Sequence, residues 1–98
     1  MKKMIAQKEI DLNDEGYMLD FAQWNKDIGT YLAEEQGVNM TDKHWEVIDY
    51  IHEKYNNEEP LSIRGIKKSG VINIKEFYAL FPGGPLKKAT LIAGIPKP

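Results

Sequence analysis

Apolar residues return every three or four positions between residues 21 and 36. This spacing places them on one side of an α-helix, so it predicts a helix over Phe21–Gln36. Asp20 stands at the N-cap position with Gln23 three residues later, as in a capping box, and Gly37 ends the segment. The predicted inner face holds Phe21, Trp24, Ile28, Tyr31 and Leu32.

The same period continues in a second long segment, which predicts a helix over Asp42–Asn56 with Thr41 as its N-cap. Its apolar stripe contains two aromatic residues. Such a stripe is more typical of a core face than of a ligand platform. The stripe consists of Trp45, Ile48, Ile51 and Tyr55.

The apolar runs become shorter after Pro60. Ser62–Lys68 is predicted to form one or two helical turns ended by Gly70, and Ile74–Leu80 a short helix that starts after Asn73. Two short helices joined by a glycine-bearing turn are compatible with a helix-turn-helix corner, although many small helical proteins contain such a corner without binding DNA.

A last helix is predicted over Leu86–Ala93. Pro85 is tolerated near its first position, because proline there lacks only an N–H that has no helical partner. Gly94 is suited to the position that follows the helix, and two prolines then stiffen the end of the chain.

The start of the chain predicts a β-hairpin. Two short extended stretches, Ile5–Leu12 and Tyr17–Leu19, flank Asn13–Gly16, which carries turn-forming side chains.

Together these elements predict a mainly α single domain over residues 1–98, with a hairpin (1–19), a helical body (20–93) and an extended C-terminal arm (94–98). The expected core residues are Trp24, Ile28, Leu32, Trp45, Ile48, Ile51, Phe77 and Leu80.

The amino-acid composition limits which catalytic and metal-binding sites the chain can form. The 98 residues contain no cysteine, which excludes disulfides, thiolate metal sites and cysteine nucleophiles within them. His44 and His52 lie eight residues apart on one predicted helix, too far to share a metal ion, and are expected to be surface or interface residues. We therefore expect no metal site and no cofactor. No apolar run is long enough to span a bilayer, so a cytoplasmic protein without a membrane partner is expected.

Charge is distributed unevenly. Residues 1–59 hold 6 Lys/Arg and 14 Asp/Glu, whereas residues 60–98 hold 7 Lys/Arg and 1 Asp/Glu. This asymmetry indicates either an anionic partner for the second half or two halves that complement each other in the fold.

Four cations would surround the predicted corner, and they are candidate contacts for an anion or a nucleic acid: Arg64, Lys67, Lys68 and Lys75. A DNA-binding regulator is therefore one hypothesis. The second helix of the corner, however, offers only Asn73, Lys75 and Glu76 to read bases. No carboxylate pair, nucleophile–base set or phosphate loop indicates an enzyme.

Four sequence motifs, in a fixed order, resemble those of a known protein family and together span nearly the whole chain. They are DEGYMLDFAQWNKDI (14–28), TDKHWEVIDYI (41–51), LFPGGP (80–85) and KKATLIAGIPKP (87–98). The chain resembles the DsrC/TusE family of small sulfur-carrier proteins, which includes the gamma subunit of dissimilatory sulfite reductase and a component of the sulfur relay to tRNA. Only residues 56–73 differ from the family, where its long basic helix is missing.

The resemblance implies a helical domain with a short hairpin and a mobile C-terminal arm that docks on a partner. Family members that carry sulfur have a cysteine near the end of the arm, and some have a second one in the preceding helix. Thr90 occupies that helix position here, and the printed sequence stops at Pro98. The residues expected to dock on a partner are Lys87, Lys88, Thr90, Gly94, Pro96, Lys97 and Pro98.

A threonine hydroxyl cannot store sulfane sulfur or act as a thiolate nucleophile. Three hypotheses therefore stay open. The first is a non-carrying, regulatory member that binds a sulfite-reductase-like or sulfur-relay partner. The second is a cropped or thiol-free form of a carrier in sulfite reduction or tRNA 2-thiolation. The third is the DNA-binding regulator. The encoded sequence beyond Pro98 would discriminate between the first two.

Overall fold

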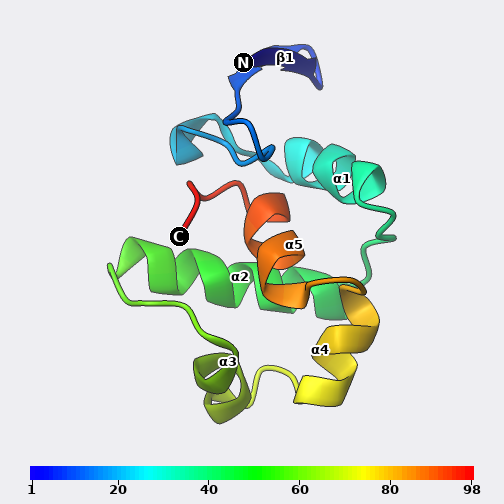
Figure 1. Cartoon of the computed structure of the whole chain (residues 1–98), viewed down its shortest axis with the longest axis vertical. Coiled ribbons are helices and arrows are strands. Elements are labelled where there is room, and N and C mark those ends of the chain that lie inside the picture. Colours follow the sequence, from blue (N-terminus) through cyan, green and yellow to red (C-terminus); the bar gives the residue numbers. More distant parts are fainter.

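Five α-helices follow a two-stranded β-hairpin in the computed structural model, which describes residues 1–98 (Figure 1). The predicted fold class, mainly α with an N-terminal hairpin, is confirmed. The elements are β1 (Lys2–Ile5), β2 (Lys8–Asp11), a 3₁₀ turn (Phe21–Gln23), α1 (Lys26–Glu35), α2 (Asp42–Asn56), α3 (Ile63–Ser69), α4 (Ile74–Leu80) and α5 (Pro85–Ile92).

The hairpin lies earlier in the chain than predicted. β1 and β2 pair antiparallel, with Ile5 opposite Lys8, so the chain reverses inside the stretch that was expected to be one strand. Ala6 and Gln7 make the turn with φ values of +49° and +66°. Both residues have positive φ, as in the two-residue turns that match the twist of hairpin strands. Ala and Gln rarely adopt this conformation, so the sequence did not reveal the turn.

The predicted turn at Asn13–Gly16 does form. The Asn13 side chain accepts hydrogen bonds from the backbone N–H groups of Glu15 and Tyr17, both at 2.9 Å. Beyond this turn, however, Leu12 and Met18 make only an isolated bridge. The second predicted strand is therefore wrong as a strand.

Helix α1 starts five residues later than predicted. Asn25 caps it, because its side chain accepts from the Ile28 N–H at 2.9 Å. Asp20 caps only the short 3₁₀ turn, and Gln23 accepts instead from the Asp11 N–H at 3.3 Å. The predicted capping box is therefore wrong. An extended Trp24 separates the 3₁₀ turn from α1.

The later helices agree closely with the sequence pattern. α2 and α4 have the predicted bounds, and α5 begins and ends one residue before its predicted limits. Asn73 caps α4 by accepting from the Glu76 N–H at 2.7 Å. Gly70 ends α3 in the left-handed conformation, at φ +77°. These local signals are confirmed.

Helix α5 lies in the middle of the fold, with α1, α2 and α4 around it (Figure 1). Of the predicted core residues, Trp24, Trp45 and Leu80 are only half-buried and pack against the main cluster. The other five are fully buried: Ile28, Leu32, Ile48, Ile51 and Phe77. Residues from the hairpin and α1 form a second, smaller cluster that meets Leu91 of α5.

The expectation that both histidines are surface or interface residues is wrong for His44, which is buried inside the protein. Its Nδ1 accepts from the Thr41 N–H at 3.0 Å, and its Nε2–H donates to the Leu80 carbonyl at 2.9 Å. His44 thus stands at the third helical position, where a capping box usually has Glu or Gln. No sequence rule for that motif lists histidine there.

None of the helices is long and apolar enough to cross a membrane. No group of three or more His, Asp or Glu side chains is gathered in a way that could hold a metal ion.

Candidate functional site

The candidate site is the C-terminal end of α5 together with the arm that follows it. Pro85 starts α5, and five of the eight helix residues are buried. The chain then leaves the helix through Gly94 and runs back over the body (Figure 1). The central position of α5 means that the start of the arm is held by the core itself.

Thr90 faces the interior of the protein. Its side chain is fully buried, and Oγ1 donates to the carbonyl oxygens of Leu86 at 2.8 Å and Lys87 at 3.1 Å. A hydroxyl that bonds back to the preceding turn is already satisfied in a helix. A side chain in this position therefore reaches a second molecule only if the end of α5 opens.

Two side chains from distant parts of the chain cap the end of α5. Trp24 Nε1–H donates to the Ile92 carbonyl at 2.9 Å, and His52 Nε2–H donates to the Ala93 carbonyl at 2.8 Å. The last carbonyls of a helix have no partner within the helix, so these bonds satisfy groups that would otherwise need water. The end of α5, from which the arm starts, is thereby anchored to both α2 and the segment before α1.

Gly94 is required at the start of the arm for two reasons. Its φ of +75° is unfavourable for residues with a side chain. In addition, a Cβ atom at this position would lie only 2.1 Å from Cδ1 of Trp24. The indole also passes so close to Gly29 that a Cβ there would lie 2.8 Å from Cζ2. Trp24 is therefore held between two glycines.

Four rings surround this point, and we call Phe21, Trp24, His52 and Tyr55 the aromatic clamp. The ring centres of His52 and Trp24 are 4.5 Å apart, those of His52 and Phe21 4.8 Å, and those of Phe21 and Tyr55 5.3 Å. Tilted and edge-on pairs at these distances are favourable. Burial lowers the pKa of His52, against the opposing effects of the Ala93 carbonyl and Asp49.

The arm lies against the body of the protein. Ile95 is buried, and Ile95–Pro98 line a hollow of about 480 Å³ together with Tyr55, Glu59, Pro60 and Leu61. Lys97 is hydrogen-bonded and ion-paired with Glu15, which belongs to the turn at Asn13–Gly16. Lys87 of α5 approaches the same carboxylate at 3.9 Å.

This ion pair shifts both titrating groups. The hydrogen bond from Lys97 lowers the pKa of the Glu15 carboxyl, and the same bond raises the pKa of Lys97. Both side chains are well exposed, so the pair is screened by water and salt. It is therefore a weak, breakable attachment for the end of the arm.

The predicted docking residues differ in how far they are buried, in three groups. Lys87, Lys97 and Pro98 are exposed, whereas Thr90 and Gly94 are buried. The remaining two are half-buried: Lys88, whose Nζ donates to the Gln36 carbonyl at 3.4 Å, and Pro96. Of the seven, only the exposed members are therefore fully open to a second molecule in this conformation.

Sequence reasoning missed the residues that hold the arm. The aromatic clamp and Glu15 come from segments far from the arm in sequence, and their spacing predicts only a core face and a turn. Trp24 was the only one of these residues that the sequence pattern singled out, as part of the apolar stripe of the predicted helix. In the structure its side chain is half-buried and lies outside α1.

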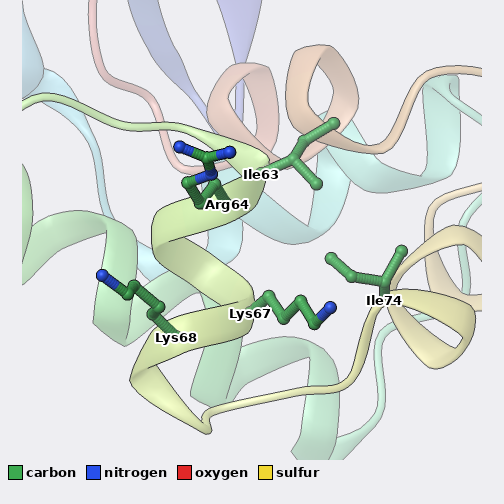
Figure 2. Close-up of a pocket in the computed structure, with 5 residues that line it drawn as sticks. All are labelled: Ile63, Arg64, Lys67, Lys68 and Ile74. Carbon is green, nitrogen blue, oxygen red and sulfur yellow. The ribbon is translucent and has the colours of Figure 1, made fainter.

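The predicted anion-binding cations lie in a separate place. Arg64, Lys67 and Lys68 line a groove of about 570 Å³ along α3 with Ile63 and with Ile74 of α4 (Figure 2). Lys75 follows Ile74 on α4 but does not line this groove.

Sequence comparisons connect the chain with sulfur-relay proteins. The family model described as DsrC like protein matches residues 4–98. Sulfurtransferase TusE from Escherichia coli (strain K12) is 37% identical over 100 residues, which cover 93% of this chain and 91% of that protein.

Solved structures agree with this relationship. A chain in the crystal structure of dissimilatory sulfite reductase I superposes with a TM-score of 0.88 at 27% identity. The oxidized gamma subunit of the dissimilatory sulfite reductase from Archaeoglobus fulgidus superposes with a TM-score of 0.83, also at 27% identity. In both cases the match covers 100% of this chain and 96% of the other.

Proposed function

Since this chain belongs to the DsrC-like protein family, we propose that it binds a sulfite-reductase-like or sulfur-relay protein without carrying sulfur itself. It would act as a regulator or competitor of a cysteine-bearing relative. The observation that carries this proposal is Thr90, a buried, hydrogen-bonded hydroxyl at the helix position where some family members have a thiol.

The chemistry of the chain supports a non-carrying role. A sulfur carrier forms a persulfide on a thiolate, and the 98 residues contain no cysteine. Thr90 lies well inside the chain, so its identity does not depend on where the sequence stops. The hydroxyl already donates to the helix backbone and has no general base beside it.

The fold supports the proposal that the chain still docks on a partner protein. Trp24 and His52 hold the two residues just before the arm, and neither contact needs a thiol. A segment that is already ordered loses less conformational entropy when it binds than a flexible tail does. Two exposed cations, Lys97 in the arm and Lys87 in α5, would meet acidic groups of a partner.

The class of partner follows from the relatives. The Escherichia coli relative is named a sulfurtransferase, and a similar chain occurs in the structure of dissimilatory sulfite reductase I. Both a relay protein and a sulfite reductase are thus proposed partners, with the cytoplasm as the place of action. We propose a binding role rather than an enzymatic one. Neither the family nor the similar structures support the DNA-binding hypothesis.

The direct test is a binding and competition experiment. The chain is titrated into dissimilatory sulfite reductase that has been freed of its own gamma subunit, and into the relay partner of Escherichia coli TusE. We expect saturable binding to at least one of them and displacement of the cysteine-bearing relative. Intact mass after incubation with a persulfide donor should show no added sulfur.

Matched lysine variants localise the binding. Lys97→Ala removes the exposed cation of the arm and should weaken binding, whereas Lys2→Ala removes an ion-paired cation from the hairpin and should not. Failure to displace the relative from either partner would overturn the docking role. Sulfur added to the 98-residue chain, which has no thiol, would overturn the chemical argument.

A further inference from the structure

The cations of this protein are unevenly paired. Of 13 Lys/Arg residues, six form ion pairs, Lys26 lies over the Trp45 ring, and Lys88 donates to a carbonyl. Five cations have no such partner. One is Lys8 in the hairpin, and the other four all lie within α3 and α4: Arg64, Lys67, Lys68 and Lys75.

Helix α3 presents these cations next to apolar side chains. Ile63 and Lys67 are four residues apart and share one side of the helix, and Arg64 and Lys68 share the neighbouring side. Figure 2 shows Lys67 extending from α3 toward Ile74 of α4, while Arg64 and Lys68 point away from it. The groove therefore combines an aliphatic wall with a cationic edge.

Helix α4 continues the apolar side of this groove. Tyr78 is one helical turn beyond Ile74, so both lie on the same side of α4, and its side chain is 50% exposed. Exposed aromatic residues are enriched where proteins bind one another, because a ring gives a large contact area with few rotatable bonds. Half of the Tyr78 surface is therefore open to a second molecule.

We propose that this α3–α4 surface, defined by Ile63, Arg64, Lys67, Lys68, Ile74 and Tyr78, binds an acidic segment of a partner protein that carries an apolar anchor residue. The carboxylates would meet Lys67, Arg64 and Lys68, and the anchor would lie against Ile63 and Ile74. This goes beyond docking through the arm, because the groove shares no residue with the hollow beside Ile95–Pro98.

An acidic protein segment fits this surface better than a nucleic acid does. A phosphate backbone makes no use of the isoleucine wall. In addition, residues 1–59 hold 14 Asp/Glu against 6 Lys/Arg, so most of the molecule would repel a long polyanion.

The test uses amide NMR spectra of the full chain and three probes. The first is a short Glu/Asp peptide with one Leu and one Phe, and the second is the same peptide with both apolar residues changed to Ser. The third is a short DNA duplex. We expect the first peptide to shift signals of α3 and α4 selectively and to bind more tightly than the other two probes.

Charge and shape variants complete the test. Lys67→Glu should weaken binding of the first peptide about tenfold, since the change replaces an attractive exposed charge by a repulsive one. Lys8→Glu is the matched control, because Lys8 is also exposed and unpaired but lies in β2, and it should leave binding unchanged. Tyr78→Ser should weaken binding without unfolding the protein.

Three results would overturn the proposal. Equal binding of the serine-substituted peptide would mean that charge alone attracts the probe. Tighter binding of the DNA duplex at the same residues would replace the acidic protein segment by a nucleic acid. Equal effects of Lys67→Glu and Lys8→Glu would mean that the groove is not the site.

Discussion

Replacing Gly94 with alanine tests how the arm is anchored. The new Cβ would lie 2.1 Å from Cδ1 and 2.6 Å from Cγ of Trp24, so the indole has to move. When it moves, Nε1–H loses its hydrogen bond to the Ile92 carbonyl, and the aromatic clamp opens. The backbone also keeps a φ near +75°, which a residue with a side chain resists.

The expected loss of stability can be worked out from these three effects. The left-handed conformation costs roughly 1–2 kcal/mol for a residue other than glycine. The lost hydrogen bond costs about 1 kcal/mol, and overpacking against a well-packed ring costs roughly 1–3 kcal/mol. Alanine offsets about 0.5 kcal/mol of this by making the unfolded chain less flexible. The sum is about 4 kcal/mol, a large part of the roughly 5–10 kcal/mol expected for a domain of this size.

Urea unfolding followed by far-UV circular dichroism measures this loss. With a slope of roughly 1–2 kcal/mol per molar, a loss of about 4 kcal/mol should lower the midpoint by about 2–4 M. Gly37→Ala is the matched control. Gly37 has a φ of +73° but no atom within 4 Å of the added Cβ, so only the conformational cost, about 1 kcal/mol, should appear. The indole N–H signal of Trp24 should shift in Gly94→Ala and stay in place in Gly37→Ala.

Equal destabilisation by the two substitutions would refute the reasoning, because Trp24 would then exert no steric demand on Gly94. A second check is the double variant Gly94→Ala with Trp24→Ala. If the ring is the obstacle, the two changes are coupled, and the double variant loses less than the sum of the single losses. Additive losses would mean that the ring and the glycine act independently.

Three further perturbations follow from the side chains around the arm and α2. Trp45→Ala should cost about 2–3 kcal/mol in urea unfolding, less than for a fully buried ring, because Trp45 is half-buried with Lys26 Nζ 4.8 Å above it; a loss below about 1 kcal/mol would make Trp45 an interface residue. The lowered pKa of Glu15 means that its bond to Lys97 stabilises the arm above the ordinary carboxyl pKa and is lost as pH falls through the lowered value. NMR titration of the Lys97 side chain should show this release, and Glu15→Gln should abolish it; an unchanged titration would contradict the ion pair. Because burial lowers the pKa of His52, the folded state favours the neutral ring, and stability should decrease as pH falls below the ordinary histidine pKa. Unfolding midpoints of His52→Gln should be flatter over that range, and a wild-type profile that is already flat would contradict the assignment.

Predictions that depended on neighbouring residues agreed best with the structure. The bounds of α2 and α4 and the cap of α4 by Asn73 follow from side chains within one helical turn, where spacing alone decides the contact. The start of α1 was predicted wrongly because the sequence offers two residues that could cap this helix. Asp20 and Asn25 are both good N-caps, and the start of α1 was decided by Trp24, which leaves the helix pattern to reach α5.

The sequence by itself determined the helical class, the family and the lack of a thiol within the 98 residues, because composition and ordered motifs do not depend on packing. Only the tertiary structure decided how the arm is held. Trp24 reaches a carbonyl 68 residues away, His52 one 41 residues away, and Lys97 a carboxylate 82 residues away. Contacts over such separations depend on how the helices pack around α5, and no period of three, four or two residues in the chain encodes that arrangement.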